Sequence, residues 1–410
     1  MIRPPLSVAA ASLLDVPAHI TDPEQLKELL GIPFTPEQTA CITAPPAPQV
    51  IVAGAGSGKT TVMAARVVWL VGTGQVAPEQ VLGLTFTNKA AGELAERVRK
   101  ALVRAGVTDP DVIDPDNPPG EPVISTYHAF AGRLLTDHGL RIGLEPTSRL
   151  LADATRYQLA ARVLREAPGP YPALTRSFPD LVSDLLALDS ELAEHLVRPK
   201  DLRAHDAELL RTLEDVRLSN ADLRRVPDTA AARRELAELV GRYRAAKRER
   251  DLLDFGDQIA LSATLAGLPE VGRVLRDEFR VVLLDEYQDT SVAQAQLLAG
   301  LFSGPAGDGR GHAVTAVGDP NQAIYGWNGA DPGLLDELSS RWPGTEVVHL
   351  DDNHRCSPQV VAAGVSVQSR VTGITITGST PMKVDRFGLG NAGVKGEPIE
   401  NAIPTITGTL

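Results

Sequence analysis

One short stretch of the sequence combines glycines, a lysine and hydroxyl residues in a way suited to binding phosphate groups. It consists of Ala53, Gly54, Ala55, Gly56, Ser57, Gly58, Lys59, Thr60 and Thr61. It follows an apolar segment and opens a helix-like segment, which is the setting of a P-loop. Glycines let backbone N–H groups surround phosphate oxygens, Lys59 would reach the β- and γ-phosphates, and Thr60 would bind Mg²⁺. The stretch therefore predicts a site for the phosphates of a nucleotide and for Mg²⁺, although Ala53 stands where the strict pattern has glycine.

Two adjacent acids after another apolar segment supply the carboxylates that a P-loop needs. Residues 281–284 are Val-Val-Leu-Leu, and Asp285 and Glu286 follow directly. Asp285 would hold Mg²⁺, directly or through water, while Glu286 would orient the attacking water or accept its proton. The plain alternative is a pair of acids on a surface turn, and the P-loop elsewhere in the chain argues against it.

Strand-like and helix-like segments alternate around these residues, as they do in βαβ units. Strands are expected at 49–53, 81–85, 122–125, 281–284, 313–317 and 346–350, and helices at 23–30, 58–71, 89–105 and 129–138. Residues 148–250 are rich in Ala, Leu, Arg and Glu with helical spacing and no convincing strand. The predicted fold class is therefore α/β, with a mostly parallel sheet and a helical insertion subdomain. The charges of that insertion are expected on solvated faces, with phosphate contact by the basic run 247–250 as the alternative.

Composition narrows the class of protein. The chain has 410 residues, 43% hydrophobic and 22% charged, which argues for two or three folded domains and against global disorder. No run approaches the roughly 18 apolar residues of a membrane-spanning helix, so no membrane partner is expected. Two cysteines cannot build a disulfide framework and fit a reducing, cytoplasmic location. The net charge of −12 argues against coating nucleic acid with bulk positive charge, so DNA contacts must be local.

The two acids begin a longer pattern that resembles a known family. The sequence Asp-Glu-Tyr-Gln-Asp-Thr-Ser at 285–291 resembles the second motif of superfamily 1 DNA helicases of the UvrD/Rep type. Further matches occur in the family's order at 34–38, 53–61, 85–91, 125–130, 253–257, 317–327 and 353–355. The resemblance runs from about residue 34 to 361 and covers the N-terminal, ATP-binding half of the family. It implies a RecA-like sheet, ATP and Mg²⁺, and ATP-dependent translocation on single-stranded DNA in repair or recombination.

The resemblance also implies roles for single residues. The expected catalytic residues are Lys59, Asp285, Glu286, Gln322 and Arg355, and Gln38 would read the adenine base. Gln322 would contact the γ-phosphate or the attacking water, and Arg355 would contact the γ-phosphate, with a surface salt bridge as its alternative. The expected DNA-binding residues are Phe86, Thr87, Asn88, Thr126, His128, Tyr325 and Trp327. Aromatic members would stack on bases and polar members would hold phosphates, with core packing as the alternative for Phe86 and Trp327.

The chain departs from the family pattern in three places. Asn328 stands where many relatives have arginine, and His354 stands where tyrosine is usual. The third departure is residues 362–410, which show neither motif V nor motif VI. The expected units are a leader at 1–33, the first part of the RecA-like domain at 34–147, and the helical insertion at 148–250. The second part of the RecA-like domain follows at 251–361, and an atypical tail, truncated or frame-shifted, at 362–410.

Other functions stay open beside the helicase. One is a nucleotide- and DNA-binding fragment without motor activity, and another is a subunit of a helicase–nuclease complex. The expected DNA partners are single strands and single-strand/duplex junctions. Coupling between the nucleotide and DNA sites would pass through hydrogen bonds of Gln288 and Asp289.

Overall fold

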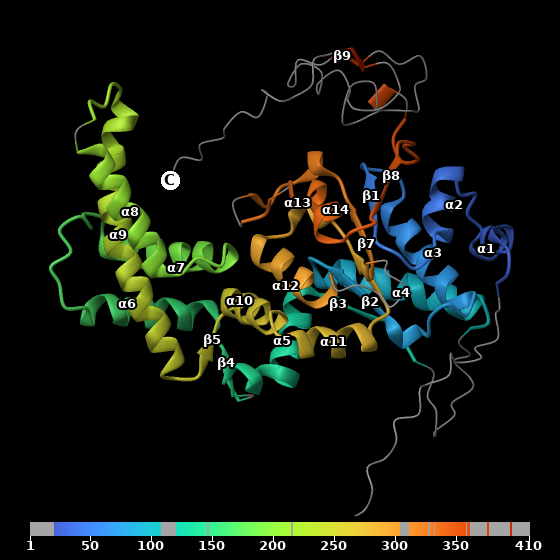
Figure 1. Ribbon diagram of the computed structural model, residues 1–410, viewed down its shortest axis with the longest axis horizontal. Helices are drawn as coiled ribbons and strands as arrows, with labels where there is room; N and C mark the ends of the chain where they lie inside the picture. Colours follow the sequence, from blue (N-terminus) through green and yellow to red (C-terminus); the bar gives the residue numbers. More distant parts are fainter. Residues whose placement is uncertain are drawn as a thin grey trace, which may run out of the picture.

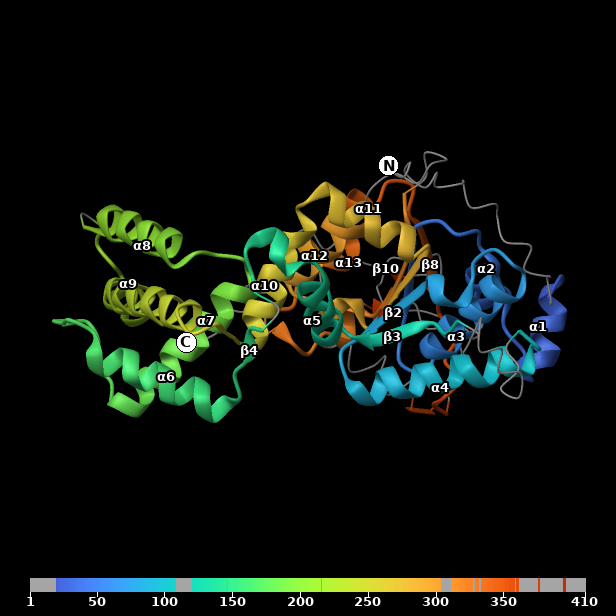
Figure 2. The same cartoon turned by 90° about the horizontal axis from the view of Figure 1, so that it is seen from below.

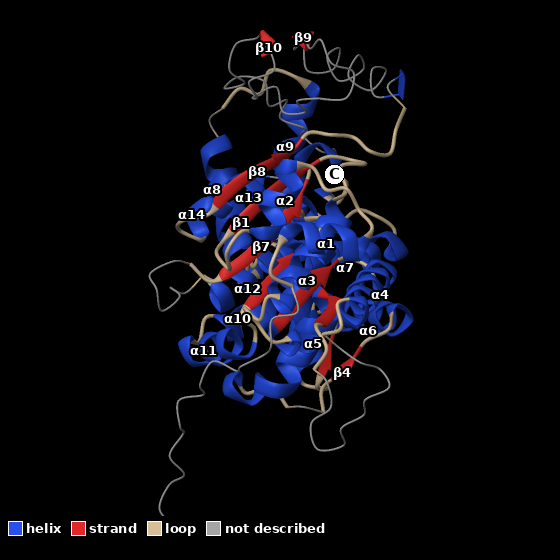
Figure 3. Cartoon of the chain, turned by 90° about the vertical axis from the view of Figure 1, so that its right-hand side faces the viewer, coloured by secondary structure: helices blue, strands red, loops and turns tan. Residues whose placement is uncertain are grey.

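A six-stranded parallel sheet lies at the centre of the protein. The computed structural model describes residues 20–107, 120–145, 147–214, 216–303, 311–326, 329–331, 333–357, 359–360, 375–376 and 394–395. The strands are β1 (Gln49–Ala53), β2 (Val81–Thr85), β3 (Val123–Thr126), β6 (Val281–Leu284), β7 (Ala313–Gly318) and β8 (Glu346–Leu350). Their spatial order is β3-β2-β6-β7-β1-β8, and Figure 3 shows them side by side between helices. The predicted α/β class with a mostly parallel sheet is confirmed.

Helices cover both faces of this sheet, because alternate side chains of each strand point to opposite faces. Val50 and Val52 of β1 belong to one apolar cluster, and Ile51 and Ala53 belong to another. The second cluster is covered by α1 (Pro23–Leu30), α2 (Pro36–Thr43), α3 (Lys59–Gly72) and α4 (Asn88–Arg104). The first is covered by α5 (Tyr127–His138), α10 (Phe255–Ala266), α11 (Pro269–Glu278), α12 (Val292–Phe302), α13 (Gly333–Asp336) and α14 (Leu338–Arg341). Figure 2 shows α4 and α11 on opposite sides of the strands.

The described part of the expected leader packs against the sheet region. Ile20 and Leu26 are buried in the same apolar cluster as Ile51 and Ala53 of β1. The Ile20 N–H donates to the Gly72 carbonyl at 2.9 Å, and a Cβ at Gly72 would lie 2.6 Å from Ile20 Cδ1. Residues 20–33 therefore pack as part of this fold. Residues 1–19 lie outside the described part of the chain.

A group of helices extends beyond one end of the sheet (Figure 1). It comprises α6 (Asp153–Glu166), α7 (Phe178–Glu194), α8 (Pro199–Leu213) and α9 (Ala221–Arg248). Helices α6, α7 and α9 share an apolar cluster of their own, with Leu159, Leu185 and Leu239 buried in it. The expectation of no strand in this region was wrong in one detail, since β4 (Arg149–Leu150) pairs in parallel with β5 (Leu252–Leu253). Two-residue strands are too short to produce a period that a sequence pattern can reveal.

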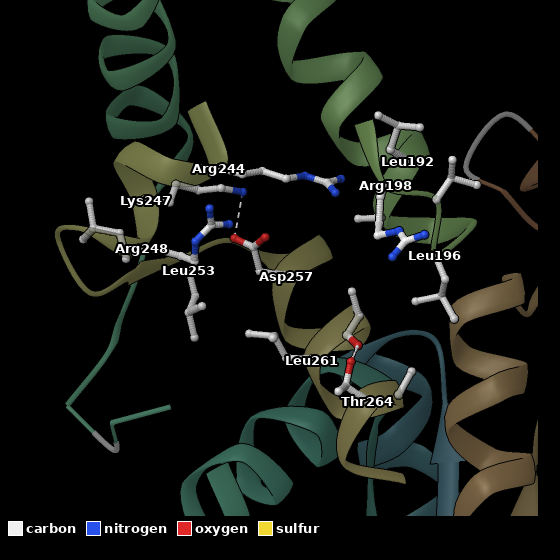
Figure 4. Close-up of a pocket in the computed structure, with 15 residues that line it drawn as sticks. Leu192, Leu196, Arg198, Arg244, Lys247, Arg248, Leu253, Asp257, Leu261 and Thr264 are labelled. Atoms are coloured by element: carbon white, nitrogen blue, oxygen red, sulfur yellow. Dashed lines mark hydrogen bonds and ion pairs between the residues drawn. The ribbon is translucent and has the colours of Figure 1, made fainter. Parts of the chain in front are cut away.

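Buried ion pairs fasten the end of α9 to α7 and to the start of α10. Lys247 Nζ lies 3.0 Å from Asp189 Oδ2, 2.7 Å from Asp254 Oδ2 and 2.7 Å from Asp257 Oδ2. Figure 4 shows Lys247 pointing toward Asp257 in the hollow between these helices. Lys247, which opens the basic run 247–250, is therefore committed to carboxylates and buried. Phosphate contact by this lysine is excluded by its packing.

Helix starts in this fold coincide with the recognised motifs. Thr35 and Gln38 form a capping box at α2, as do Asp254 and Asp257 at α10. Shorter elements complete the described chain: η1 (Pro78–Gln80), η2 (Gly139–Ile142), η3 (Tyr287–Asp289), η4 (Pro320–Gln322), β9 (Thr375–Ile376) and β10 (Val394–Lys395). Among the residues described, no helix is long and apolar enough to cross a membrane.

Candidate functional site

The P-loop connects the end of β1 to the start of α3. Gly56 and Gly58 have φ angles of +80° and +86°, a region that residues with a Cβ rarely adopt. The Ser57 hydroxyl donates to the Gly54 carbonyl at 2.7 Å and closes the turn. A Cβ at Gly56 would lie 2.7 Å from Asn353 Oδ1 and 2.8 Å from Arg355 Cβ, so only glycine fits there. The loop is thus a narrow cradle of backbone N–H groups at a helix N-terminus, which is suited to phosphate.

Lys59 and the two acids after β6 come together at this cradle. Lys59 Nζ lies 2.7 Å from Glu286 Oε2, although 227 positions separate the two residues. Burial and then the like charge of Glu286 raise the pKa of Asp285 to about 6, while Lys59 acts in the opposite direction. Glu286 has a φ of 48°, which is uncommon for a residue with a side chain. Thr60 and Thr61 follow Lys59 at the start of α3 and are partly exposed.

A line of hydrogen bonds leads from Glu286 to the loop after β7. The Gln288 side chain donates to Glu286 Oε2 at 2.9 Å and accepts from the Asp319 N–H at 2.9 Å. The Gln322 amide donates to the Asp319 carboxylate. A Cβ at Gly318 would lie 2.7 Å from Gln288 Oε1, which explains the glycine there. Gln322 is therefore connected to Glu286 through two intermediate residues, Asp319 and Gln288.

Asp289 makes a second connection between the same two segments. Its Oδ1 accepts from the N–H of Ile324 at 3.0 Å and from that of Tyr325 at 3.3 Å. The Tyr325 ring stacks on Phe86 with a centroid distance of 6.1 Å and an interplanar angle of 13°. Direct contacts thus connect residues 286–289, where Glu286 contacts Lys59, to Phe86, the aromatic residue that follows β2.

Gln38, which was expected to read the adenine base, lies against the P-loop. Its side-chain N–H donates to the Ser57 carbonyl at 2.9 Å, and its Oε1 accepts from the Thr35 N–H at 3.1 Å. Both ends of the amide therefore have protein partners. Gln38 joins helix α2 to the loop that would surround the phosphates.

Arg66 was not anticipated as a site residue, yet it links α3 to α2 and to β7, three elements around the cradle. It is fully buried on α3, and its side chain donates to Thr315 Oγ1 on β7 at 3.0 Å. It also donates to the carbonyls at the end of α2, namely Cys41 at 2.8 Å, Ile42 at 3.3 Å, Ala44 at 2.9 Å and Pro45 at 3.1 Å. Burial lowers the pKa of Arg66 to about 10, which leaves it charged at neutral pH. A lone arginine inside an apolar helical segment was the available signal in the sequence.

The segment after β8 also contacts the P-loop. The Asn353 amide donates to the Ala55 carbonyl at 2.9 Å, and the His354 N–H donates to the Gly56 carbonyl at 2.8 Å. Asn353 Oδ1 accepts from the Arg355 N–H at 3.0 Å, which fixes the backbone of Arg355 beside the cradle. The side chain of Arg355 is exposed. Asn353 is a positioning residue that the sequence indicated only as part of a motif.

A hollow at the end of the sheet collects most of the residues expected to bind DNA. It is lined by Phe86, Thr87, Asn88, Thr126 and His128 from the sheet region, together with Phe255 and Gln258 of α10. Helices α6 and α7 line it as well, through Arg156, Ser190 and Glu194. Tyr325 reaches this group through its stacking on Phe86, while Trp327 and Asn328 lie outside the described residues.

The expected hydroxyl contacts already have a structural role. Thr87 Oγ1 accepts from the Ala90 N–H at 3.1 Å, and Thr126 Oγ1 accepts from the Ala129 N–H at 3.2 Å. Both residues are therefore N-caps, of α4 and α5, and orient these helix starts toward the hollow.

Phe255 is an addition that single-residue reasoning missed. It is 48% exposed and lies edge-on to His128, with ring centroids 5.3 Å apart. It could have been found because it belongs to the Leu-Asp-Phe-Gly-Asp segment already recognised. Two aromatic rings and one imidazole thus face a single hollow, an arrangement suited to stacking.

Comparison with known proteins agrees with this arrangement. The family model described as the UvrD/REP helicase N-terminal domain matches residues 34–343. A probable DNA helicase II homolog of Rickettsia conorii is 28% identical over 341 residues, which cover 82% of this chain and 44% of that protein. The ATP-dependent DNA helicase UvrD2 of Mycobacterium tuberculosis is 32% identical over 330 residues, covering 80% of this chain and 42% of the relative.

A third relative gives the same picture. The ATP-dependent DNA helicase UvrD1 of Mycobacterium leprae is 29% identical over 359 residues, covering 86% of this chain and 42% of the relative. The chain therefore spans less than half the length of these curated relatives. Because the family model covers most of the chain, the resemblance stated from the sequence is confirmed, and the chain belongs to the UvrD/REP helicase N-terminal domain family.

Proposed function

We propose that this chain is the ATP-binding half of a DNA helicase motor, which hydrolyses ATP when single-stranded DNA is bound. The observation that carries the proposal is the 2.7 Å contact of Lys59 Nζ with Glu286 Oε2 beside the buried Asp285. A P-loop lysine and two carboxylates at the ends of parallel strands are the groups that ATP hydrolysis uses. The relatives named above are DNA helicases, and the mycobacterial ones are named as ATP-dependent, which supports the same function.

The residues of the cradle fit ATP with Mg²⁺. The positive φ angles of Gly56 and Gly58 turn backbone N–H groups inward, and α3 adds the partial positive charge of its N-terminus. Thr60 and Asp285 would supply oxygen ligands of the kind Mg²⁺ prefers, and the bound ion would offset charge on the phosphates. Residues 53–61 would hold the phosphates, and Gln38 would contact the adenine.

The side chains around the cradle would have different roles in ATP hydrolysis. Lys59 would leave Glu286 for the phosphates, which frees Glu286 to orient water or accept its proton. The hydrogen bond from Gln288 keeps the Glu286 carboxylate in place during this exchange. Gln322 and Arg355 would contact the γ-phosphate region, where Arg355 offsets developing charge.

Single-stranded DNA is the proposed ligand of the hollow beside α10. Phe86, His128 and Phe255 would stack on bases, which is worth about 1–3 kcal/mol per base and tolerates any sequence. Asn88 and the helix starts at Thr87 and Thr126 would hold backbone phosphates. Coupling would pass from Glu286 through Gln288 and Asp289 to Tyr325 and Phe86. Trp327 is proposed for the same surface on the resemblance alone.

The test is steady-state ATP hydrolysis by the 410-residue chain with and without single-stranded DNA. DNA-stimulated turnover is expected, and Lys59→Ala is expected to reduce it about a hundredfold or more, because a cation that offsets phosphate charge is removed. Lys100→Ala, an exposed lysine on α4, is the matched control and should keep full turnover. Turnover that persists in Lys59→Ala would overturn the proposal.

Binding without motor activity is the second candidate, as a nucleotide- and DNA-binding part or a subunit of a helicase–nuclease complex. The relatives' names describe whole helicases, of which this chain spans 42–44%, so motor activity of the chain by itself is a separate proposal from binding. Strand separation on a single-strand/duplex junction distinguishes the two, since only the motor would separate strands.

We also propose that 148–250 is an insertion subdomain of a RecA-like domain, because α6, α7 and α9 have their own apolar cluster. A role in DNA repair or recombination stays part of the proposal.

A further inference from the structure

We infer that a second hollow, where the helical region 148–250 meets the sheet region, binds a small organic anion with an apolar body and one acidic group. This junction hollow has a volume of about 500 Å³, which lies in the range of sites that hold a single small molecule. None of its lining residues belongs to the proposed nucleotide or DNA sites. The inference is therefore independent of the proposed function.

Five parts of the chain surround the junction hollow. They are the end of α7, the segment 196–198 before α8, the end of α9, strand β5 and helix α10. Figure 4 shows Leu192 and Leu196 across the hollow from Arg248 and Leu253. Helices α7 and α9 contribute to the apolar cluster of the helical region, and α10 contributes to that of the sheet region. A ligand in this position would contact both regions at once.

Most of the lining is apolar, which favours a ligand with an apolar body. The apolar members are Leu192, Ala193, Leu196, Val197, Leu252, Leu253, Ala260, Leu261 and Ala263. Leu196 is 38% exposed and has a φ of 55°, a region that residues with a side chain rarely adopt. A leucine is thus held in a strained conformation with part of its surface in water. Covering such side chains removes apolar surface from water, which favours binding.

Three of the charged lining residues compensate one another or are compensated within the protein. Lys247 contacts three carboxylates, and the Asp257 carboxylate is one of them. Arg244 Nε donates to Asp189 Oδ1 at 2.6 Å. The acid of the lining is therefore already paired with a lysine, so it does not call for a cationic ligand.

Arg248 supplies the charge that remains. It is exposed, and none of the ion pairs among the described residues includes it, although its neighbours Lys247 and Arg250 both have acidic partners. Figure 4 shows its guanidinium extending toward the interior of the hollow. Across the hollow, Arg198 pairs with Asp201 in a solvent-exposed contact, which is weak. The available charge is thus positive, and a guanidinium fits a carboxylate, phosphate or sulfonate group well.

The same features distinguish this ligand from a nucleic acid strand. Among the described residues that line the junction hollow, none is aromatic, so bases would find no ring to stack on. One uncompensated cation beside an apolar surface matches a single acidic group on an apolar body. The volume also suits one small molecule better than a chain of nucleotides.

The experiment uses two fluorescent probes that differ in one group. One is 8-anilinonaphthalene-1-sulfonate, and the other is its uncharged counterpart, N-phenyl-1-naphthylamine. Each is titrated into the full 410-residue chain, and both are expected to bind, the sulfonate more tightly. Arg248→Gln should weaken binding of the sulfonate about fivefold and leave the uncharged probe unchanged, because only a charge contact is lost. Arg225→Gln, an exposed arginine near the start of α9, is the matched control and should bind both probes as the wild type does.

A second variant tests the position of the apolar body. Leu261→Trp should fill part of the junction hollow and weaken binding of both probes about tenfold or more, since the ligand and the indole would compete for the same space. Circular dichroism checks that this variant folds, and Arg248→Gln changes only an exposed side chain. Unchanged sulfonate binding in Arg248→Gln, or unchanged binding of both probes in folded Leu261→Trp, would overturn the inference. Absence of binding to the wild-type chain would overturn it as well, without bearing on ATP or DNA.

Discussion

The sheet region and the helical region at 148–250 are held by different interactions. In the sheet region, β1, β2, β6 and β7 are buried throughout, and two apolar clusters fill the space on either face. The helical region has a smaller apolar cluster, and its junction with α10 depends on Lys247 and three carboxylates. Stability in the first region thus comes from many small apolar contacts, and at the junction it depends on a few charges.

This difference predicts unequal responses to substitution. Apolar packing loses free energy in proportion to the atoms removed, so small changes have small effects. A buried group of charges loses much more free energy of unfolding from a single substitution, because removing one partner leaves the others uncompensated. The three tryptophans, Trp69, Trp327 and Trp342, lie outside 148–250, so their fluorescence follows the sheet region separately from the helical one.

Replacing the central lysine of the junction should have the largest effect. Lys247→Met leaves Asp189, Asp254 and Asp257 without their shared cation and should lower the free energy of unfolding by about 3–5 kcal/mol. Urea unfolding followed by circular dichroism should show the helical region melting before the tryptophan signal changes. Lys200→Met, an exposed lysine on α8, should stay within about 0.5 kcal/mol of the wild type. Coincident transitions in Lys247→Met would contradict the comparison.

A smaller effect, of opposite sign, is expected at the candidate active site. The pKa of Asp285 rises in the folded state from 3.8 to about 6, so the folded chain binds the proton more tightly than the unfolded one. Stability from this group is present below pH 4 and is lost as the pH rises through 6. Asp285→Asn should therefore raise the free energy of unfolding at pH 7.5 by about 2–3 kcal/mol.

The pH dependence of this gain separates it from a general stabilisation. The gain should disappear at pH 3.5, and Asp137→Asn, half-exposed on α5, should show no gain at either pH. An equal gain at both pH values would sink the electrostatic explanation. ATP turnover should be lost in Asp285→Asn, since the proposed Mg²⁺ ligand is removed.

The smallest effect is expected within the sheet. Ile51→Val removes one methylene-sized group from a fully buried position on β1 and should cost about 1 kcal/mol. Circular dichroism and tryptophan fluorescence should shift together in this variant, because the sheet region keeps its packing. Separate transitions would contradict this expectation, because they would show that the sheet and helical regions unfold independently even when the sheet keeps its packing.

The sequence predicted the elements better than their connections. Segments 23–30, 49–53, 81–85, 281–284 and 346–350 match observed bounds, because runs of apolar residues and proline or glycine mark them clearly. The start of α5 was missed by two residues, since Thr126 caps the helix before its apolar pattern begins. The order of the six strands depends on tertiary packing, which no local pattern encodes.

For the candidate site, too, the sequence predicted local motifs better than contacts between distant segments. Contiguous motifs identified residues 53–61, Asp285 and Glu286, whose types alone suggest phosphate chemistry. Contacts between distant segments, such as Asn353 with Ala55 and Arg156 with Ser190, could not be read from spacing. Their partners lie 298 and 34 positions away. The roles of the individual site residues stay predictions.

The buried guanidinium of Arg66 has a mechanical consequence. Helix α2 is eight residues long, about 12 Å, and is held at its end by Arg66 and at its start by the bond from Gln38 to Ser57. A short rod fixed at both ends cannot tilt without breaking one attachment. A displacement of the P-loop at Ser57 is therefore carried along α2 to Arg66 and on to Thr315 of β7. Helix α2, whose Gln38 would contact the adenine, and the P-loop, which would hold the phosphates, should then shift as one rigid body.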